Sequence, residues 1–224
     1  MKIIFCLPGK QFSNNFLTSW SMLLVACIRN GHEVIISQNY SSVVHFARAL
    51  CLGGDVLAGT TQKPFQGKLE YDYIMWIDSD MVFSPEEFLP MLESPHSITC
   101  GLYRMQNMTH FAVVKTWDTE YFKEKGTFPF LSVEEFKKYK EDKEPRYMEV
   151  DYAGMGWMLI KKGVIESIKY PWFYRPAYKM DKDGVTLMDM LSEDVSFCKN
   201  LQEAGYQIML DTNIIVGHEK SVVL

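Results

Sequence analysis

The chain has 224 residues, 47% hydrophobic and 23% charged, a balance typical of a single globular domain. Its formal net charge of −5, with no basic block or stripe, argues against a general nucleic-acid binder. No stretch approaches the roughly 20 apolar residues that span a bilayer, and the N-terminal apolar run is too short for a signal peptide.

The first hundred residues alternate between short apolar runs and segments with apolar residues at helical spacing. Strands are predicted at 2–7, 33–37 and 73–77, and helices at 16–29, 43–52 and 84–92. The last of these helices has Ser84 in the N-cap position and Pro85 at its first position. Because strands and helices alternate, the pattern predicts an α/β fold whose central strands are parallel.

After Ser94-Pro95 this alternation stops. Further strands are predicted at 98–103, 111–117, 147–152, 157–160, 207–210 and 214–216, and helices at 133–140, 162–168 and 192–204. Residues 171–192 are rich in Pro, Tyr, Asp and Lys and are predicted to form a long loop that can act as a lid. No repeat, low-complexity tract or linker divides the chain, so a single domain over 1–224 is expected.

Two carboxylates follow the third predicted strand. The segment IMWIDSDMVF places Asp78 and Asp80 two residues apart at the carboxyl end of a buried strand. Ligands bind at that edge of open α/β sheets. Two carboxylates so close need a neutralising partner, and Mg²⁺ or Mn²⁺ supplies one while bridging to substrate phosphates. A solvated turn also accommodates Asp-x-Asp, but the apolar residues on both sides favour a metal site.

The Asp-x-Asp segment and four further motifs resemble glycosyltransferases with the GT-A fold, close to the family 2 type. The four are Phe46–Leu50 around Arg48, Asp151–Ile160, Ser192–Cys198 and Val216–His218. Their order and spacing hold over about residues 2–220. The resemblance implies one Rossmann-like GT-A domain with a central mixed, mostly parallel sheet flanked by helices. Its nucleotide-binding part would cover about 1–104 and its acceptor-binding part about 105–224.

By this resemblance the chain is expected to move a sugar from a nucleoside-diphosphate sugar, with UDP as the favoured nucleotide, to a hydroxyl of a glycan or glycoprotein. The expected ligands of Mn²⁺ or Mg²⁺ are Asp78, Asp80 and His218, and a nitrogen ligand suits Mn²⁺. The expected contacts to the donor nucleotide and its diphosphate are Pro8, Gly9, Arg48, Asp78 and Lys220. Gly9 ends the first strand, where a glycine permits close approach of a nucleotide but also suits a plain turn.

An inverting transferase needs a base to take the proton from the acceptor hydroxyl. The resemblance favours Asp194 in this role, with Glu193 orienting the acceptor or a loop. Acidic residues in a first helical turn are also explained by the helix dipole alone, and a retaining transferase would not use Asp194 as a base. The expected contacts to the acceptor are Asp151, Gly154 and Trp157.

Three other classes of function stay open. A haloacid-dehalogenase-type phosphohydrolase would use Asp78 as nucleophile and Asp80 as acid/base, but that family carries its motif on the first strand and adds a downstream Gly-Asp pair. A sugar-phosphate nucleotidyltransferase should have a Gly-rich basic loop after the first strand, which LPGKQFSNN matches poorly. A non-catalytic nucleotide- or sugar-binding domain would need neither metal nor base.

The five cysteines are scattered and form no CxxC pair, which is typical of reduced packing residues. A cytoplasmic location is therefore expected. The resemblance extends to the small transferases that large DNA viruses encode, for which this would be the host cytoplasm. The chain ends six residues after His218, so further domains in a longer parent chain are also expected.

Overall fold

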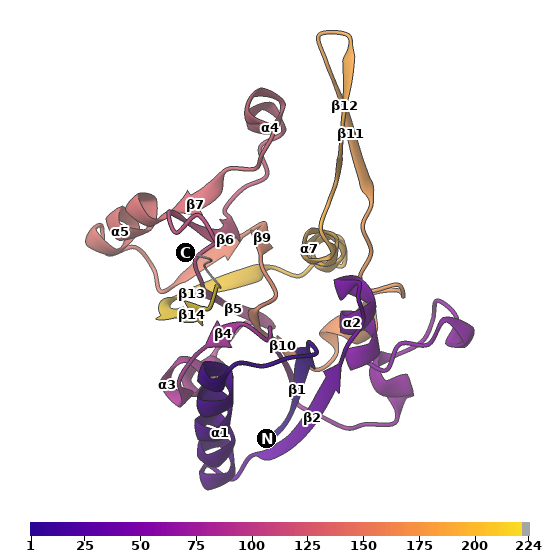
Figure 1. Cartoon of the computed structure of the whole chain (residues 1–224), viewed down its shortest axis with the longest axis vertical. Helices are drawn as coiled ribbons and strands as arrows, with labels where there is room; N and C mark the ends of the chain where they lie inside the picture. Colours follow the sequence, from indigo (N-terminus) through magenta and orange to yellow (C-terminus); the bar gives the residue numbers. More distant parts are fainter. Residues whose placement is uncertain (221–224) are drawn as a thin grey trace.

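A seven-stranded sheet forms the centre of the computed structural model, which describes residues 1–220 (Figure 1). In spatial order its strands are β2 (Glu33–Asn39), β1 (Lys2–Pro8), β3 (Tyr73–Ile77), β10 (Trp157–Lys161), β5 (Ile98–Leu102), β13 (Ile208–Ile215) and β8 (Tyr147–Val150). β1 runs parallel to β2 and β3, and β13 parallel to β5, whereas β10 and β8 run antiparallel to their neighbours. The predicted α/β fold with a mixed, mostly parallel sheet is confirmed.

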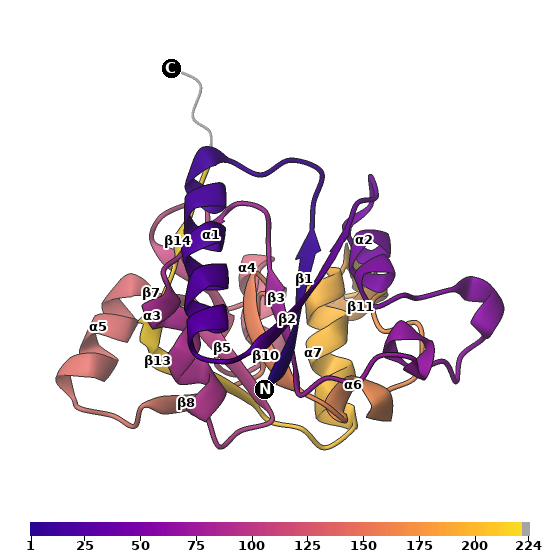
Figure 2. The same cartoon turned by 90° about the horizontal axis from the view of Figure 1, so that it is seen from below.

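Helices cover both faces of this sheet because alternate residues of its strands are apolar on both sides. Ile3 and Phe5 of β1 pack with α1 (Asn14–Arg29), α3 (Pro85–Phe88) and η3 (Leu89–Glu93). Ile4 and Cys6 face the other core, which α2 (Val44–Cys51), α6 (Val164–Ser167) and α7 (Glu193–Glu203) complete. Figure 2 shows α1 on one side of the sheet and α2 with α7 on the other.

The predicted helix at 84–92 is split in two. Ser84 caps α3 through a capping box with Glu87, as expected from the sequence. The helix then tightens into the 3₁₀ turn η3, which has Pro90 near its start. Proline removes a backbone N–H and crowds the preceding turn, which explains the break.

Smaller elements surround the second half of the sheet. A three-stranded sheet contains β7 (Phe130–Ser132), β6 (His110–Val114) and β9 (Tyr152–Ala153), and it carries α4 (Thr119–Lys125) and α5 (Val133–Glu141). Two short strands, β4 (Met81–Val82) and β14 (Gly217–His218), pair with each other. The 3₁₀ turns η1 (Val56–Ala58) and η2 (Pro64–Gly67) lie between α2 and β3.

The prediction of a structureless loop at 171–192 is wrong. Ala177–Lys182 (β11) and Val185–Met190 (β12) form an antiparallel hairpin that projects from the body of the molecule (Figure 1). Asp183 and Gly184 join the strands with φ angles of 50° and 79°, the left-handed pair that a tight two-residue turn requires. Both strands are largely exposed, so the segment lacks the apolar run that marks a buried strand.

All five cysteines, Cys6, Cys27, Cys51, Cys100 and Cys198, are free thiols in the core. Within residues 1–220, no helix is both long and apolar enough to cross a bilayer.

Candidate active site

A buried arginine holds three carboxylates together at the carboxyl edge of the sheet. Arg48 lies on α2, and its side chain is 2% exposed. Its Nη2 donates to Asp78 Oδ2 at 3.1 Å, while Nη1 lies 3.0 Å from Asp78 Oδ1. Its Nε donates to Glu193 at 3.3 Å, and Asp194 Oδ1 lies 3.8 Å from Nη2. The guanidinium also stacks 5.7 Å from the Trp76 ring centroid.

The cluster is short of positive charge, because one guanidinium faces three carboxylates. Burial raises the pKa of Asp194 to about 7, with Arg48 opposing this shift and the neighbouring Glu193 adding to it. Asp194 Oδ2 accepts a hydrogen bond from the Met155 N–H at 3.3 Å, whereas Oδ1 accepts none from residues 1–220. Asp194 is therefore a carboxyl group with a raised pKa and one buried oxygen that accepts no hydrogen bond within residues 1–220.

Asp80 has the opposite environment. Pairing of β4 with β14 brings His218 Nε2 to 3.1 Å from Asp80 Oδ2, and Lys220 Nζ lies 2.6 Å from the same oxygen. Burial opposes ionisation, but the hydrogen bonds from His218 and Lys220 outweigh it and lower the pKa of Asp80 to about 2. For Asp78, burial prevails over Arg48 and raises the pKa. Two carboxylates only two residues apart thus titrate differently.

The donor set can be compared with the needs of a divalent cation. Within residues 1–220, no three His, Cys, Asp or Glu side chains are arranged to hold a metal ion on their own. His218 Nδ1 lies 2.7 Å from the carbonyl oxygen of Arg104, so it donates there and the ring presents Nε2 towards Asp80. A ring N–H on a backbone carbonyl is the usual support of a metal-ligating histidine. Asp80 and His218 therefore offer an oxygen and a nitrogen donor of the kinds that a divalent cation takes.

Gly9 lies beside the acidic pair. A Cβ on Gly9 would fall 2.7 Å from Ser79 Cβ, the side chain between the two aspartates. Pro8 is the last residue of β1, so the end of this strand and the Asp-x-Asp turn occupy the same part of the sheet edge. A nucleotide contact at Pro8-Gly9 stays a prediction.

Tyr103 belongs to the site but has no obvious signal in the sequence. It follows β5, and its hydroxyl accepts a hydrogen bond from the Gly156 N–H at 3.2 Å. Burial and the nearby Asp78 and Asp194 raise the pKa of Tyr103. A methyl group on Gly154 would lie 1.9 Å from the Tyr103 hydroxyl oxygen. Gly154, which was expected to contact the acceptor, and Gly156 thus make room for Tyr103. In the sequence, the Gly-x-Gly pattern at 154–156 is the one signal of this packing.

The side chains of the other two expected acceptor contacts are engaged inside the fold. Both Asp151 oxygens are used inside the fold, by the Trp117 N–H at 2.7 Å and by Gln202 Nε2 at 3.0 Å. Trp157 is 0% exposed and packs against Phe83, with ring centroids 4.7 Å apart. In this structure neither side chain is available to a sugar at the cluster.

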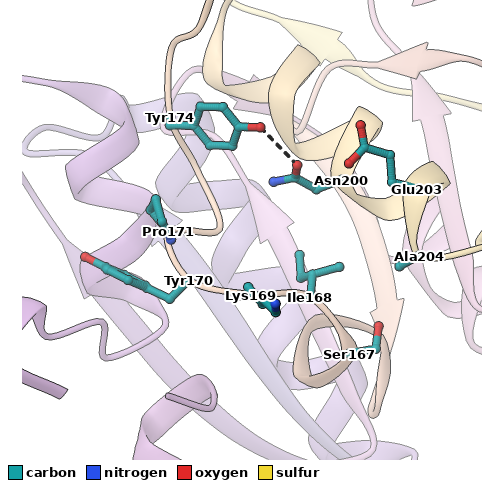
Figure 3. Close-up of a pocket in the computed structure, with 9 residues that line it drawn as sticks. All are labelled: Ser167, Ile168, Lys169, Tyr170, Pro171, Tyr174, Asn200, Glu203 and Ala204. Atoms are coloured by element: carbon teal, nitrogen blue, oxygen red, sulfur yellow. Dashed lines mark hydrogen bonds between the residues drawn. The ribbon is translucent and has the colours of Figure 1, made fainter. Parts of the chain in front are cut away.

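A cavity of about 560 Å³ lies elsewhere, between the α6–β11 segment and the later turns of α7 (Figure 3). The Tyr174 hydroxyl donates across it to Asn200 Oδ1 at 3.1 Å. None of the expected catalytic, metal or donor residues lines this cavity. It is therefore separate from the cluster.

Solved structures share this architecture. A197 from STIV matches with a TM-score of 0.53 and 16% identity, over 100% of this chain and 97% of that one. GalNAc-T7, solved with UDP, GalNAc and Mn²⁺, matches with a TM-score of 0.50 and 10% identity, over 99% of this chain but 44% of that one. The catalytic domain of Drosophila beta1,4-galactosyltransferase 7, in complex with xylobiose, gives a TM-score of 0.48 and 13% identity over 98% and 71%. No protein-family model and no curated protein matches the sequence.

These likenesses establish the fold. The chain has the GT-A fold of glycosyltransferases, as its motifs predicted. Identities of 10–16% do not carry over a donor, a metal or an acceptor. The assignment of individual site residues therefore rests on the geometry described above and on the proposals that follow.

Replacement of Arg48 by Met should destabilise the protein by about 3–5 kcal/mol, because it leaves buried carboxylates without their cation. The loss should be smaller at pH 5 than at pH 8, since protonation relieves the uncompensated charge. Urea unfolding at both pH values measures this. Arg29→Met, at the exposed end of α1, is the matched control and should behave as wild type. Equal stability of Arg48→Met and wild type at pH 8 would contradict this account of the cluster.

The raised pKa of Asp194 predicts a pH-dependent stability. Its folded-state pKa of about 7 exceeds the roughly 3.9 of an unfolded aspartate, so the folded chain binds more protons between these values. This contribution to stability is complete below about pH 4 and is lost as pH rises through 7. Asp194→Asn removes this titration. The melting temperature of Asp194→Asn minus that of wild type should therefore increase from pH 5 to pH 8. A constant difference across this range, or the same trend in the exposed control Asp142→Asn, would refute the assignment.

Proposed function

We propose that the chain is a metal-dependent glycosyltransferase that moves a sugar from a UDP-sugar to a hydroxyl of a glycan or glycoprotein. The observation that carries this proposal is the meeting of Asp78, Asp80, His218 and Asp194 at the carboxyl edge of a GT-A sheet. A cation-binding pair and a titratable carboxyl group lie at the edge where ligands bind in such sheets. GalNAc-T7, of similar fold, was solved with UDP and Mn²⁺, which supports the choice of nucleotide and metal.

Asp80 and His218 are the residues that would hold Mn²⁺ or Mg²⁺, with Asp78 behind them. When bound, the cation would neutralise the negative charge of the diphosphate leaving group. Lys220 shares the Asp80 oxygen and can pair with diphosphate oxygens when the carboxylate binds the cation. Gly9 is needed as a glycine because the Ser79 side chain packs against it, so a nucleotide contact at Pro8 and Gly9 is proposed from their place at the end of β1 beside the Asp-x-Asp turn.

The role proposed for Arg48 differs from the contact with the donor nucleotide that the sequence predicted. Its side chain is almost wholly buried, and its donors are directed at Asp78 and Glu193. We therefore assign Arg48 as a positioning residue that fixes Asp78 and the first turn of α7. Glu193, which is buried and tied to Arg48, has the same supporting part.

Asp194 is the proposed base. Its Oδ2 is oriented by the Met155 N–H, and its Oδ1 is buried without a hydrogen-bond partner among residues 1–220, so it keeps an unused acceptor for the proton of a hydroxyl that reaches it. A pKa of about 7 suits a general base, because the group is ionised near neutral pH yet still accepts a proton readily. This role belongs to an inverting transferase.

Arg48 also argues against the phosphohydrolase alternative. A carboxylate nucleophile must present a free oxygen to phosphorus, whereas both Asp78 oxygens face the guanidinium. The acidic pair also follows the third strand along the chain rather than the first. The nucleotidyltransferase alternative is weakened because the segment after β1 leads through the Ser13 cap into α1 without a Gly-rich basic loop.

Asp80→Asn should reduce Mn²⁺-dependent release of UDP from UDP-sugars at least about 100-fold, because the cation then loses its charged ligand. The assay compares UDP-glucose, UDP-galactose and their N-acetyl counterparts with and without Mn²⁺. Glu144→Gln, which removes an exposed carboxylate remote from the cluster, is the control and should retain wild-type turnover. Metal-dependent turnover that survives in Asp80→Asn would overturn the proposed function.

The rate of transfer should increase with pH through about 7 and then level off, because Asp194 must be ionised to act as base. Asp194→Asn should lower kcat by about 100-fold or more and remove this pH dependence. ¹H NMR of the product gives a second test, since a base at this position predicts inversion at the anomeric carbon. A retained configuration would exclude Asp194 as base.

A further inference from the structure

A small pocket of about 200 Å³ lies next to the first turn of α7, between the β11–β12 hairpin and the α4–β7 segment. Ser192 and Val195, which flank the Glu193-Asp194 pair in sequence, form part of its wall. Its chemical character comes from five aromatic rings and one carboxylate, which belong to Trp117, Phe122, Phe128, Phe130, Tyr152 and Asp189. The pocket thus lies beside the helical turn that carries the proposed base.

The aromatic rings are held in place by one another. The Phe128 centroid lies 4.7 Å from that of Trp117 and 4.8 Å from that of Phe122, and Tyr152 packs at 6.2 Å from Phe130. Edge-on and tilted arrangements at these distances are favourable for aromatic pairs. Because the rings are already fixed in the absence of a ligand, binding would cost little side-chain conformational entropy.

The hairpin closes the pocket because it is anchored to α4, and Figure 1 shows both projecting from the same side of the molecule. Lys182 Nζ donates to the Lys123 carbonyl at 2.8 Å, and the Tyr178 hydroxyl lies 3.4 Å from Thr119 Oγ1. Asp189 is opposite Tyr178 in the strand register and so lies on the same face of the hairpin. Its Oδ1 accepts from the Met190 N–H at 2.7 Å, which orients the carboxylate.

These walls match a sugar better than a cation or a larger apolar group. A pyranose has an apolar C–H face that stacks on aromatic rings and a rim of hydroxyls that donate to a carboxylate. The volume is below the roughly 300–1,000 Å³ of pockets for drug-sized ligands, so it suits a single ring. A cation is disfavoured because Lys199 Nζ already lies 5.5 Å from the Trp117 ring centroid and 5.1 Å from that of Tyr178.

We propose that this pocket binds one pyranose ring of the acceptor, with Asp189 accepting a hydrogen bond from a ring hydroxyl. The inference rests on the proposed function, because it places the acceptor sugar against the turn of α7 that carries Asp194. It assigns acceptor recognition to Asp189 and the aromatic rings, in place of Asp151 and Trp157.

The test is direct binding of methyl glycosides of xylose, glucose, galactose and their N-acetyl counterparts. Binding is measured by ligand-observed NMR, without nucleotide or metal. Wild type should bind at least one of them. Asp189→Asn should weaken this binding about fivefold to tenfold, because it loses a charged acceptor. Phe128→Leu should weaken it further while the thermal transition shows that the chain stays folded. Met188→Ala, on the opposite and exposed face of the hairpin, is the matched control and should bind as wild type.

The pocket assignment would be overturned if wild type bound no glycoside, or if wild type, Asp189→Asn and folded Phe128→Leu bound it equally. Binding of tetramethylammonium in preference to every glycoside would also overturn it. Failure of the proposed function is separate, because it is measured as UDP release. Turnover of UDP-sugars without glycoside binding rejects the pocket alone, whereas glycoside binding without UDP release rejects the donor chemistry alone.

Discussion

The contact of Arg48 with its carboxylates is the constraint on which the rest of the site depends. It joins the end of β3, through Asp78, to the first turn of α7, through Glu193 and Asp194. Without a buried cation these acids could not share one edge of the sheet, since burial and mutual repulsion disfavour their ionised forms. Burial is the main cause of the raised pKa of Asp194, and the neighbouring Glu193 adds to it while Arg48 opposes it.

A second set of contacts separates the two aspartates of the acidic pair. Asp80 faces His218 and Lys220, which come from the end of the described chain, whereas Asp78 faces inward to Arg48. The pKa of Asp80 is lowered and that of Asp78 is raised, although the residues are two positions apart. An exposed, ionised carboxylate is the better cation ligand. The geometry thus gives Asp80 the surroundings expected of the proposed cation ligand and holds Asp78 in place against Arg48.

The central strands and the acidic pair were predictable, whereas the hairpin and the roles of some distant side chains were not. Apolar runs identified β1, β2 and β3 and placed Asp78 and Asp80 at a sheet edge, because a buried strand leaves a local pattern in the chain. The β11–β12 hairpin left none, since its strands are exposed and only the Asp183-Gly184 turn marks it. Tyr103 and Trp157 acquire their positions from contacts distant in sequence. No local pattern could assign one to the site and the other to the core.

This difference has a physical basis in what each part of the site must do. Donor chemistry needs carboxylates and a cation at fixed positions, and fixed positions come from a packed sheet and its buried ion pairs. Acceptor recognition needs only a surface of suitable shape, which segments outside the core can supply and vary at little cost in stability. Here that surface combines the hairpin with the α4–β7 segment, and Leu191 joins the hairpin directly to the Ser192 cap of α7. The most variable kind of element is therefore attached by two residues to the helix that carries the proposed base.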